Sequence, residues 1–260
     1  MIRRRPSPLG PRPATRDDAF GASPAMIEAM TNLPLTHLVR RPLDVSASPP
    51  MLVLLHGYGS NEQDLFALAP YLDERFLIVS PRAPYTLSPG YYAWFNLEVG
   101  PGGITVDEAE AVSSRPRLIQ FIRAAAEAYG ADPQRIYLAG FSQGATMSLG
   151  VMLAAPDSVA GVVAMSGFLL PAFVEQAAPD GQFAGLPVLV VHGEEDELVP
   201  VTRGRECRDV LSRLPVALAY REYPMRHQIS DESLDDVSQW LSEALERQTA
   251  DGRRQTADAG

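Results

Sequence analysis

The sequence predicts an α/β fold, a mostly parallel, twisted β-sheet with helices on both faces and no separate cap domain. Three observations predict it. Short apolar, β-favouring runs alternate with helical patterns along the body of the chain. Several runs are continuously apolar, as in strands covered on both faces. Glycines, serines and histidines stand where the runs end, and in such sheets the site lies at the carboxyl ends of the strands.

The 260 residues are expected to form one domain, over residues 35–246, between two segments without fixed structure. Residues 1–34 are rich in Pro, Arg, Ala and Ser and are expected to be mostly disordered. Residues 247–260 repeat Arg-Gln-Thr-Ala-Asp and are expected to be an unstructured polar tail. No internal duplication of globular length favours a second domain.

Apolar patterns place four elements in the first third of the chain. They are an edge strand over 35–41, a buried strand over 51–55, a helix over 61–72 and a buried strand over 76–79. Residues 81–104 are expected to form one long loop, rich in proline, glycine and aromatic residues. Loops of this length are usually functional or disordered, and the aromatic content argues against disorder.

The rest of the chain continues the alternation. We expect a helix with Pro116 near the first turn of its main part, because proline suits that position. A strand over 136–139 leads into a second helix. The elements expected beyond it are strands over 159–165, 187–191 and 216–223, and helices over 202–214 and 231–246.

Between the strand over 136–139 and its helix lies Gly140-Phe141-Ser142-Gln143-Gly144, which fits the G-x-S-x-G nucleophile elbow. A strand that turns at once into a helix brings the two glycine positions together. Side chains there would collide, so only glycine fits, and the serine sits in a strained turn with an exposed hydroxyl. We therefore take Ser142 as the candidate nucleophile over an ordinary turn serine.

A serine hydroxyl needs an imidazole to take its proton and a carboxylate to orient that imidazole. With this elbow the chain order is Ser, acid, His. His227, in the loop after the last strand, is the candidate base, because His192 closes a strand and more plausibly holds the strand end. Asp196 is the candidate acid, just past a strand end. Its neighbours Glu194, Glu195 and Glu197, and also Asp180, remain alternatives, whereas Asp231, Asp235 and Asp236 follow the histidine and break the order.

A tetrahedral intermediate also needs two N–H donors for its oxyanion. Gln143 follows the nucleophile and begins a helix, and Tyr58 lies in the glycine-rich loop after the strand over 51–55. We expect their backbone N–H groups to form the oxyanion hole. Ser166 lacks the glycine two residues before it, and Cys207 lies within a helical stretch, so neither is preferred as the nucleophile.

Composition excludes several function classes. The net charge of −10 argues against a nucleic-acid partner. The basic start lacks an apolar signal core, and no run approaches the ~18 apolar residues of a membrane span, so we expect the cytoplasm and no stable membrane insertion. The single cysteine cannot form an internal disulfide. No histidine or carboxylate cluster has ligand spacing, so neither a metal nor an organic cofactor is expected.

Together these segments resemble the phospholipase/carboxylesterase family of α/β-hydrolases, which includes acyl-protein thioesterases and small bacterial carboxylesterases. The resemblance covers residues 50–235 in order. The matching segments are Leu55-His56-Gly57-Tyr58-Gly59 with Asp64, Pro81-Arg82-Ala83-Pro84, Tyr92-Ala93-Trp94-Phe95, the elbow, Ser166-Gly167, His192-Gly193 with Asp196 and Val199-Pro200, and His227. The resemblance implies the same catalytic triad, Ser142, Asp196 and His227, and the same oxyanion donors, Tyr58 and Gln143.

The expected activity is hydrolysis of short- to medium-chain carboxylic esters, with thioesters or lysophospholipids as further substrates. Only about twenty residues separate the strand ending at Met165 from the one starting at Pro187, too few for a cap. We expect an open site with a substrate groove walled by Trp94, Phe95, Phe168 and Leu169. The alternatives are a peptidase or lactonase on the same elbow and a catalytically silent binding protein. A homodimer is the expected assembly if the chain associates.

Two positions depart from the family pattern. Asn96 stands where aspartate is usual after the Trp-Phe pair, so the negative charge of that position is missing here. Arg226 stands where glycine is common before the histidine, and we hypothesise that its charge attracts anionic substrates. The variant Arg226→Ala is therefore expected to lose preference for anionic over neutral esters. An unchanged preference, together with an unchanged pH–rate profile, would show that this hypothesis is wrong.

Overall fold

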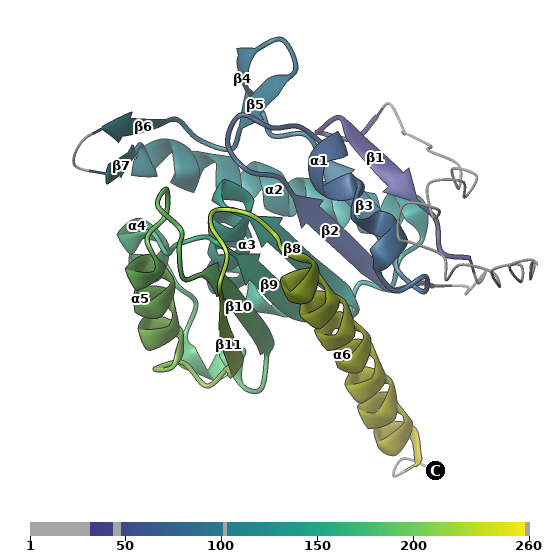
Figure 1. Ribbon diagram of the computed structural model, residues 1–260. Helices are drawn as coiled ribbons and strands as arrows, with labels where there is room; N and C mark the ends of the chain where they lie inside the picture. Colours follow the sequence, from purple (N-terminus) through teal and green to yellow (C-terminus); the bar gives the residue numbers. More distant parts are fainter. Residues whose placement is uncertain (1–31, 44–47, 101–102, 258–260) are drawn as a thin grey trace, which may run out of the picture.

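The computed structural model describes residues 32–43, 48–100 and 103–257. Its centre is a seven-stranded sheet in the order β1-β3-β2-β8-β9-β10-β11, in which only β1 runs antiparallel to its neighbour (Figure 1). The predicted mostly parallel sheet is confirmed, and so is the edge strand expected over 35–41, whose antiparallel direction the sequence did not predict. The strands are β1 His37–Arg40, β2 Met51–Leu55, β3 Leu77–Pro81, β8 Ile136–Phe141, β9 Gly161–Met165, β10 Pro187–Gly193 and β11 Ala217–Tyr223.

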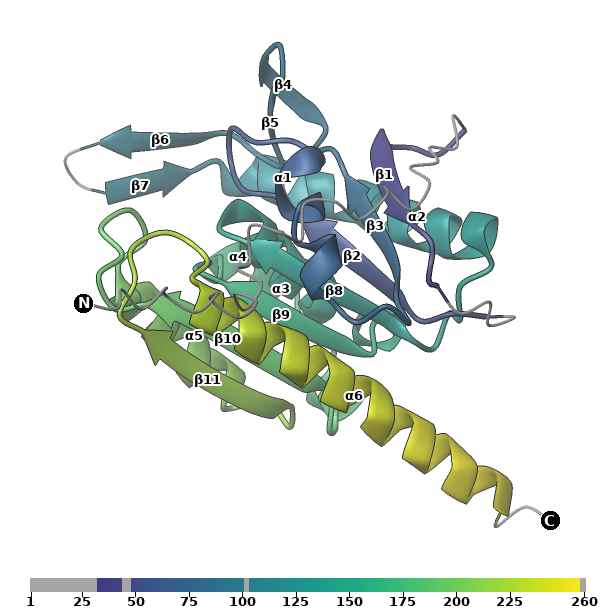
Figure 2. The ribbon, with the colours of Figure 1, turned by 45° about the vertical axis from the view of Figure 1, so that its right-hand side comes forward.

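Helices cover both faces of the sheet, so the protein has two cores (Figures 1 and 2). The pleat of β2 divides its side chains between them: Val53 and Leu55 point into one core, and Leu52 and Leu54 point into the other. One face is covered by α2 Glu108–Tyr129, α3 Gln143–Ala154, α4 Pro171–Glu175 and α5 Val201–Leu211. The other is covered by α1 Gln63–Phe66, the 3₁₀ turn η2 Ala69–Tyr71 and α6 Asp231–Ala257. The short 3₁₀ turns η3 Pro156–Ser158 and η4 Asp180–Phe183 lie in connecting segments.

The segment predicted as one long loop instead forms two β-hairpins that project from the body (Figure 1). The first pairs β4 Tyr85–Ser88 with β5 Tyr91–Ala93, and Gly90 takes a φ of 87° in its turn. The second pairs β6 Leu97–Gly100 with β7 Gly103–Val106. Tyrosine, threonine and valine favour strands, and glycine-rich turns let the segment fold back on itself.

Two helix predictions are also corrected. The helix expected over 61–72 is broken into α1 and η2, because Pro70 at the start of η2 has no N–H to continue the α-helix. Helix α2 begins well before Pro116, which lies inside it rather than near its first turn. The reason is the cap: the side chain of Asp107 accepts a hydrogen bond from the Glu110 N–H at 3.0 Å and starts the helix there.

The predicted disorder over residues 1–34 falls outside the described residues apart from 32–34. The unstructured tail predicted from 247 is wrong as far as Ala257, because α6 continues to that residue. The Tyr137 hydroxyl donates to Gln248 Oε1 at 2.9 Å, and Gln248 Nε2 donates to the Gln134 carbonyl at 2.6 Å. Although α6 has 27 residues, no helix in the described part of the chain is apolar enough over enough length to cross a membrane.

These contacts predict that Tyr137 and Gln248 stabilise the fold as a coupled pair. Gln248→Ala leaves the hydroxyl of Tyr137, a residue that is 1% exposed, without its partner, so we expect the free energy of unfolding to fall by about 1–3 kcal/mol. Tyr137→Phe in the same background removes the orphaned hydroxyl and should cost less than it does alone. Urea unfolding of the two single variants and the double variant measures the coupling. Strict additivity would contradict a role for this hydrogen bond.

Candidate active site

Ser142 lies at the junction of β8 and α3, with φ 54° and ψ −116°, a region that non-glycine residues rarely adopt. The glycines on either side permit this turn. A Cβ on Gly140 would overlap the carbonyl of Gly144, and one on Gly144 would overlap the carbonyl of Leu55 in β2. The predicted close approach of the two glycines is confirmed for Gly140, whereas Gly144 is required because β2 lies against it.

The structure brings the three predicted polar side chains together. His227 Nε2 lies 2.9 Å from Ser142 Oγ, and His227 Nδ1 lies 2.7 Å from Asp196 Oδ2. Since a carboxylate only accepts, Nδ1 carries the proton toward Asp196 and Nε2 accepts from the serine hydroxyl. The ring of Phe141 packs against the imidazole, with centroids 4.9 Å apart. This arrangement is chemically suited to deprotonating Ser142.

Asp196 is held by its own turn. Its side chain has no exposed surface, and its Oδ1 accepts the N–H groups of Leu198 at 3.0 Å and Val199 at 2.8 Å. The Glu195 N–H donates to the carbonyl of Met225 at 3.1 Å, which ties the acid turn to the loop that carries His227. The turn therefore presents Oδ2 toward the imidazole.

His192, the last residue but one of β10, supports the same turn. Its Nε2 lies 2.8 Å from the Val199 carbonyl and 3.6 Å from Asp196 Oδ2. Since a carbonyl only accepts, Nε2 carries a proton. Burial lowers the pKa of His192, which favours the neutral ring. The sequence predicted that His192 holds the strand end. It did not predict the hydrogen bond from His192 to the Val199 carbonyl in the turn of Asp196.

His56 supports the glycine-rich loop after β2 in a similar way. Its Nε2 accepts the Ala83 N–H at 3.1 Å, so Nδ1 carries the proton and donates to the Gly57 carbonyl at 2.8 Å. Gly57 packs against the nucleophile, since a Cβ there would lie 3.4 Å from Ser142 Cβ. Tyr58 follows Gly57, and Gln143 begins α3, where the first N–H groups have no acceptor within the helix.

Trp94 and Phe95 do not line an open groove, so that prediction is corrected. Neither has exposed surface. The side chain of Gln143 holds them, since its Oε1 accepts the Trp94 N–H at 2.7 Å and its Nε2 donates to the Phe95 carbonyl at 2.7 Å. The indole Nε1 in turn donates to the His56 carbonyl at 2.9 Å. The sequence analysis did not predict that the Gln143 side chain binds the backbone of Trp94 and Phe95. The only signal in the sequence was a long amide side chain at the start of a helix of small residues.

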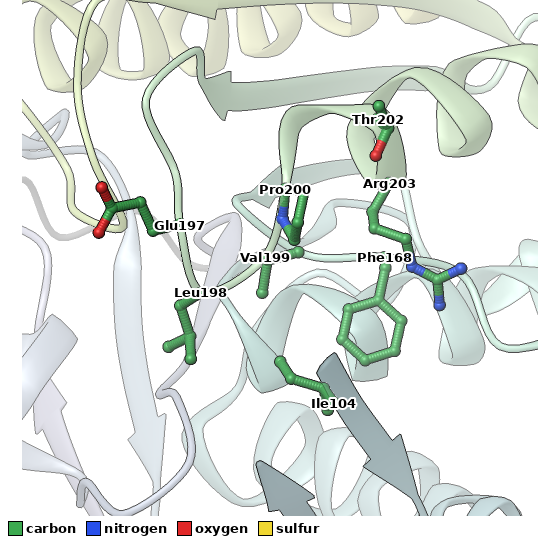
Figure 3. Close-up of a pocket in the computed structure, with 8 residues that line it drawn as sticks. All are labelled: Ile104, Phe168, Glu197, Leu198, Val199, Pro200, Thr202 and Arg203. Atoms are coloured by element: carbon green, nitrogen blue, oxygen red, sulfur yellow. The ribbon is translucent and has the colours of Figure 1, made fainter. Parts of the chain in front are cut away.

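The other two predicted substrate residues lie at cavities. Phe168 is 5% exposed and lines a cavity of about 340 Å³, as Figure 3 shows. Leu169 lines a neighbouring cavity of about 450 Å³. The Phe168 N–H lies 3.3 Å from Thr146 Oγ1 in α3, which fixes this segment beside the elbow helix.

The departure at Asn96 has a structural reason. Its backbone N–H and its Nδ2 donate to the two carboxylate oxygens of Glu110, at 2.7 and 3.0 Å. An aspartate side chain here would face that carboxylate as a like charge, which is unfavourable. Arg226 has an exposed side chain next to His227, and its effect on substrate charge stays a prediction.

Neither the competing serine nor the cysteine takes part in the hydrogen bonds that join Ser142, His227 and Asp196. Ser166 also has a positive φ, 51°, but its hydroxyl is buried without a hydrogen-bond partner among the described residues. Burial raises the pKa of the Cys207 thiol to about 12, so it stays protonated and unreactive. Over the described ranges, no three His, Cys, Asp or Glu side chains gather in a way that would hold a metal ion.

Comparisons with known proteins agree with this geometry. The chain matches the family described as Phospholipase/Carboxylesterase over residues 45–245. It is 28% identical to acyl-protein thioesterase 1 of Gibberella zeae over 73% of this chain and 85% of the relative. It is also 28% identical to a probable inactive carboxylesterase of Oryza sativa subsp. japonica, over 77% of this chain and 87% of the relative.

Solved structures show the same fold. The crystal structure of esterase PE8 is 28% identical, with a TM-score of 0.68, and covers 79% of this chain and 97% of its own. The carboxylesterase of Bacillus cereus, 23% identical, has a TM-score of 0.70 over 82% of this chain and 96% of its own. The fold class predicted from the sequence is confirmed.

The buried imidazoles predict how stability depends on pH. Burial lowers the pKa of His37, His56 and His192 below 6.5, so below that pH the unfolded chain binds protons that the folded chain does not. Stability should therefore fall as pH drops from about 6.5, by up to about 1.4 kcal/mol per pH unit for each imidazole, and should be insensitive to these groups above pH 7.5. Urea unfolding between pH 5.5 and 8 measures the slope. His37→Asn, remote from Ser142, should reduce it, and a flat profile would contradict the prediction.

Proposed function

Because the chain belongs to the phospholipase/carboxylesterase family of serine hydrolases, we propose that it hydrolyses carboxylic esters through an acyl-enzyme on Ser142. The family resemblance read from the sequence is confirmed by the match over residues 45–245. The observation that supports the proposed activity is the hydrogen-bonded chain from Ser142 Oγ through His227 to Asp196. The substrate class is small esters or thioesters.

In the acylation step, His227 Nε2 takes the proton of Ser142 as Oγ attacks the ester carbonyl. Asp196, turned toward Nδ1, holds the imidazole in the correct tautomer and stabilises its charged form. The imidazolium then gives the proton to the leaving alkoxide or thiolate. Water attacks the acyl-enzyme by the same route, which returns the carboxylic acid and the free serine.

The oxyanion of each tetrahedral intermediate would be bound by the backbone N–H groups of Tyr58 and Gln143. Gly57 lies against Ser142, and Gln143 adds the positive end of α3. Losing one such donor typically costs about 2.7–4 kcal/mol of barrier. Two buried side chains, those of His56 and Gln143, hold these donors in place.

The geometry of the site bears on the alternative functions that the sequence leaves open. A catalytically silent protein stays an alternative, since one relative is named a probable inactive carboxylesterase. Here, however, serine, imidazole and carboxylate are all present within hydrogen-bonding distance, which favours an active enzyme. A peptidase or lactonase would use the same side chains and differ in substrate. The short- to medium-chain preference, the cytoplasmic location and a homodimer stay predictions.

Ser142→Ala tests the proposal. We expect the purified protein to hydrolyse p-nitrophenyl butyrate and to be labelled by a fluorophosphonate probe, because both reactions need the activated hydroxyl. The variant should lose probe labelling and about 10⁴-fold or more of kcat. Ester, thioester and peptide substrates compared side by side then separate the bond types.

Ser166→Ala is the matched control, because Ser166 is also a strand-end serine with a positive φ. Its hydroxyl has no partner among the described residues, so its removal should leave labelling and turnover near wild type. Labelling that persists in Ser142→Ala, or disappears only in Ser166→Ala, would refute the assignment of Ser142.

A further inference from the structure

A cavity of about 340 Å³ lies beside the turn that carries Asp196, since Leu198 and Val199 belong to that turn and line the cavity. Two segments that line this cavity also contact residues of the candidate active site. Leu198 and Val199 donate their N–H groups to Asp196, and Phe168 follows Gly167, whose Cα packs close to the Ser142 carbonyl. The side chains of Ile104, Phe168 and Leu198 point into the same space, whereas the Glu197 carboxylate points away from it (Figure 3). Apolar side chains therefore form one part of the wall of a cavity that lies beside the turn of Asp196.

A second cavity of about 450 Å³ lies on the surface between α4 and α5. Its lining is mostly apolar and comes from Leu169, Pro171, Val174, Cys207 and Val210. Leu169 and Phe168 are neighbours in the chain, so the two cavities lie on either side of one short segment. This second space is not part of the hydrogen-bonded site.

Arg203, in the first turn of α5, lines both cavities. Its guanidinium carbon lies 5.1 Å from the centroid of the Phe168 ring, and Nη1 lies 3.0 Å from Glu206 Oε2. The side chain is 44% exposed, and both kinds of contact are weak at such a surface position. Arg203 therefore contacts both cavities without being buried in either.

We propose that the two cavities are parts of one groove for the apolar chain of an ester substrate, and that Arg203 divides this groove and sets the chain length accepted. The proposal rests on the proposed function. With Arg203 stacked on Phe168, only the cavity beside the active site receives the chain, which favours short and medium acyl esters. Without the guanidinium, a longer chain continues into the space between α4 and α5. Each methylene buried there is worth about fourfold in binding.

The experiment measures kcat/KM for p-nitrophenyl esters with acyl chains from acetyl to dodecanoyl, and for butyrate esters of alcohols of matched length. For the wild type, kcat/KM is expected to be highest at a short or medium chain in one of the two series, either the acyl series or the alcohol series. Arg203→Ala should move that peak to longer chains, with a gain of up to about fourfold for each methylene that enters the second cavity. The gain should appear in KM, because the added contacts bind ground state and transition state alike.

Arg205→Ala is the matched control. Arg205 lies on the same helix and is similarly exposed, but its guanidinium is paired with Glu222 at 2.8 and 2.7 Å and lines neither cavity. Its loss removes the same charge and should leave the chain-length profile unchanged. A shift of equal size in both variants would show that charge, and not the division of the groove, sets the preference, and would overturn the proposal.

A second variant fills the outer cavity. Val174 lines it and is 38% exposed, so a larger side chain there needs no space in the core. Arg203→Ala/Val174→Trp should return the optimum to the shorter chain. If Arg203→Ala keeps the wild-type profile in both ester series, or if the tryptophan leaves the extended profile unchanged, the proposal is wrong. Failure of the wild type to hydrolyse any ester or to react with the fluorophosphonate would instead refute the proposed function.

Discussion

The backbone of Ser142 is the constraint on which the rest of the site depends. A serine at φ 54° is strained, typically by about 1–3 kcal/mol, so the surrounding structure has to hold it there. The Ser142 N–H donates to the Met165 carbonyl of β9 at 2.8 Å, and the Ser142 carbonyl accepts from the Thr146 N–H at 3.1 Å. Close packing of Gly140 and Gly144 completes the turn. The sheet and α3 thus fix the position of one hydroxyl.

Two buried histidines hold two of the segments that surround Ser142. His56 fixes the loop that carries the Tyr58 N–H, and His192 fixes the turn that carries Asp196. Each bonds a backbone carbonyl, and burial lowers the pKa of both rings, which favours their neutral form. His56 and His192 thus have structural roles, whereas the proton transfer is proposed for His227.

The projecting hairpins and the α4–α5 region shape what reaches the site. The side chain of Gln143 ties Trp94 and Phe95 to the start of α3, so the first hairpin is anchored to the elbow itself. Ile104 of β7 and Phe168 face the same cavity (Figure 3). The cavity is thus lined by the second hairpin and by the segments after β9 and β10, while Ser142, Asp196 and His227 follow the ends of β8, β10 and β11.

The sequence by itself determined the alternating fold, the elbow and the order of serine, acid and histidine. The strands and the elbow are encoded locally, since continuous apolar runs predict buried strands and two glycines predict a turn too tight for side chains, whereas the order of the three residues follows from the chain order known for this elbow. Only the tertiary structure decided which aromatic side chains are buried and which line a cavity. Trp94 and Phe95 are buried because the distant Gln143 holds their backbone, and α6 continues past Arg247 where Gln248 meets Tyr137. Such contacts join residues far apart in the chain, so no local pattern predicts them.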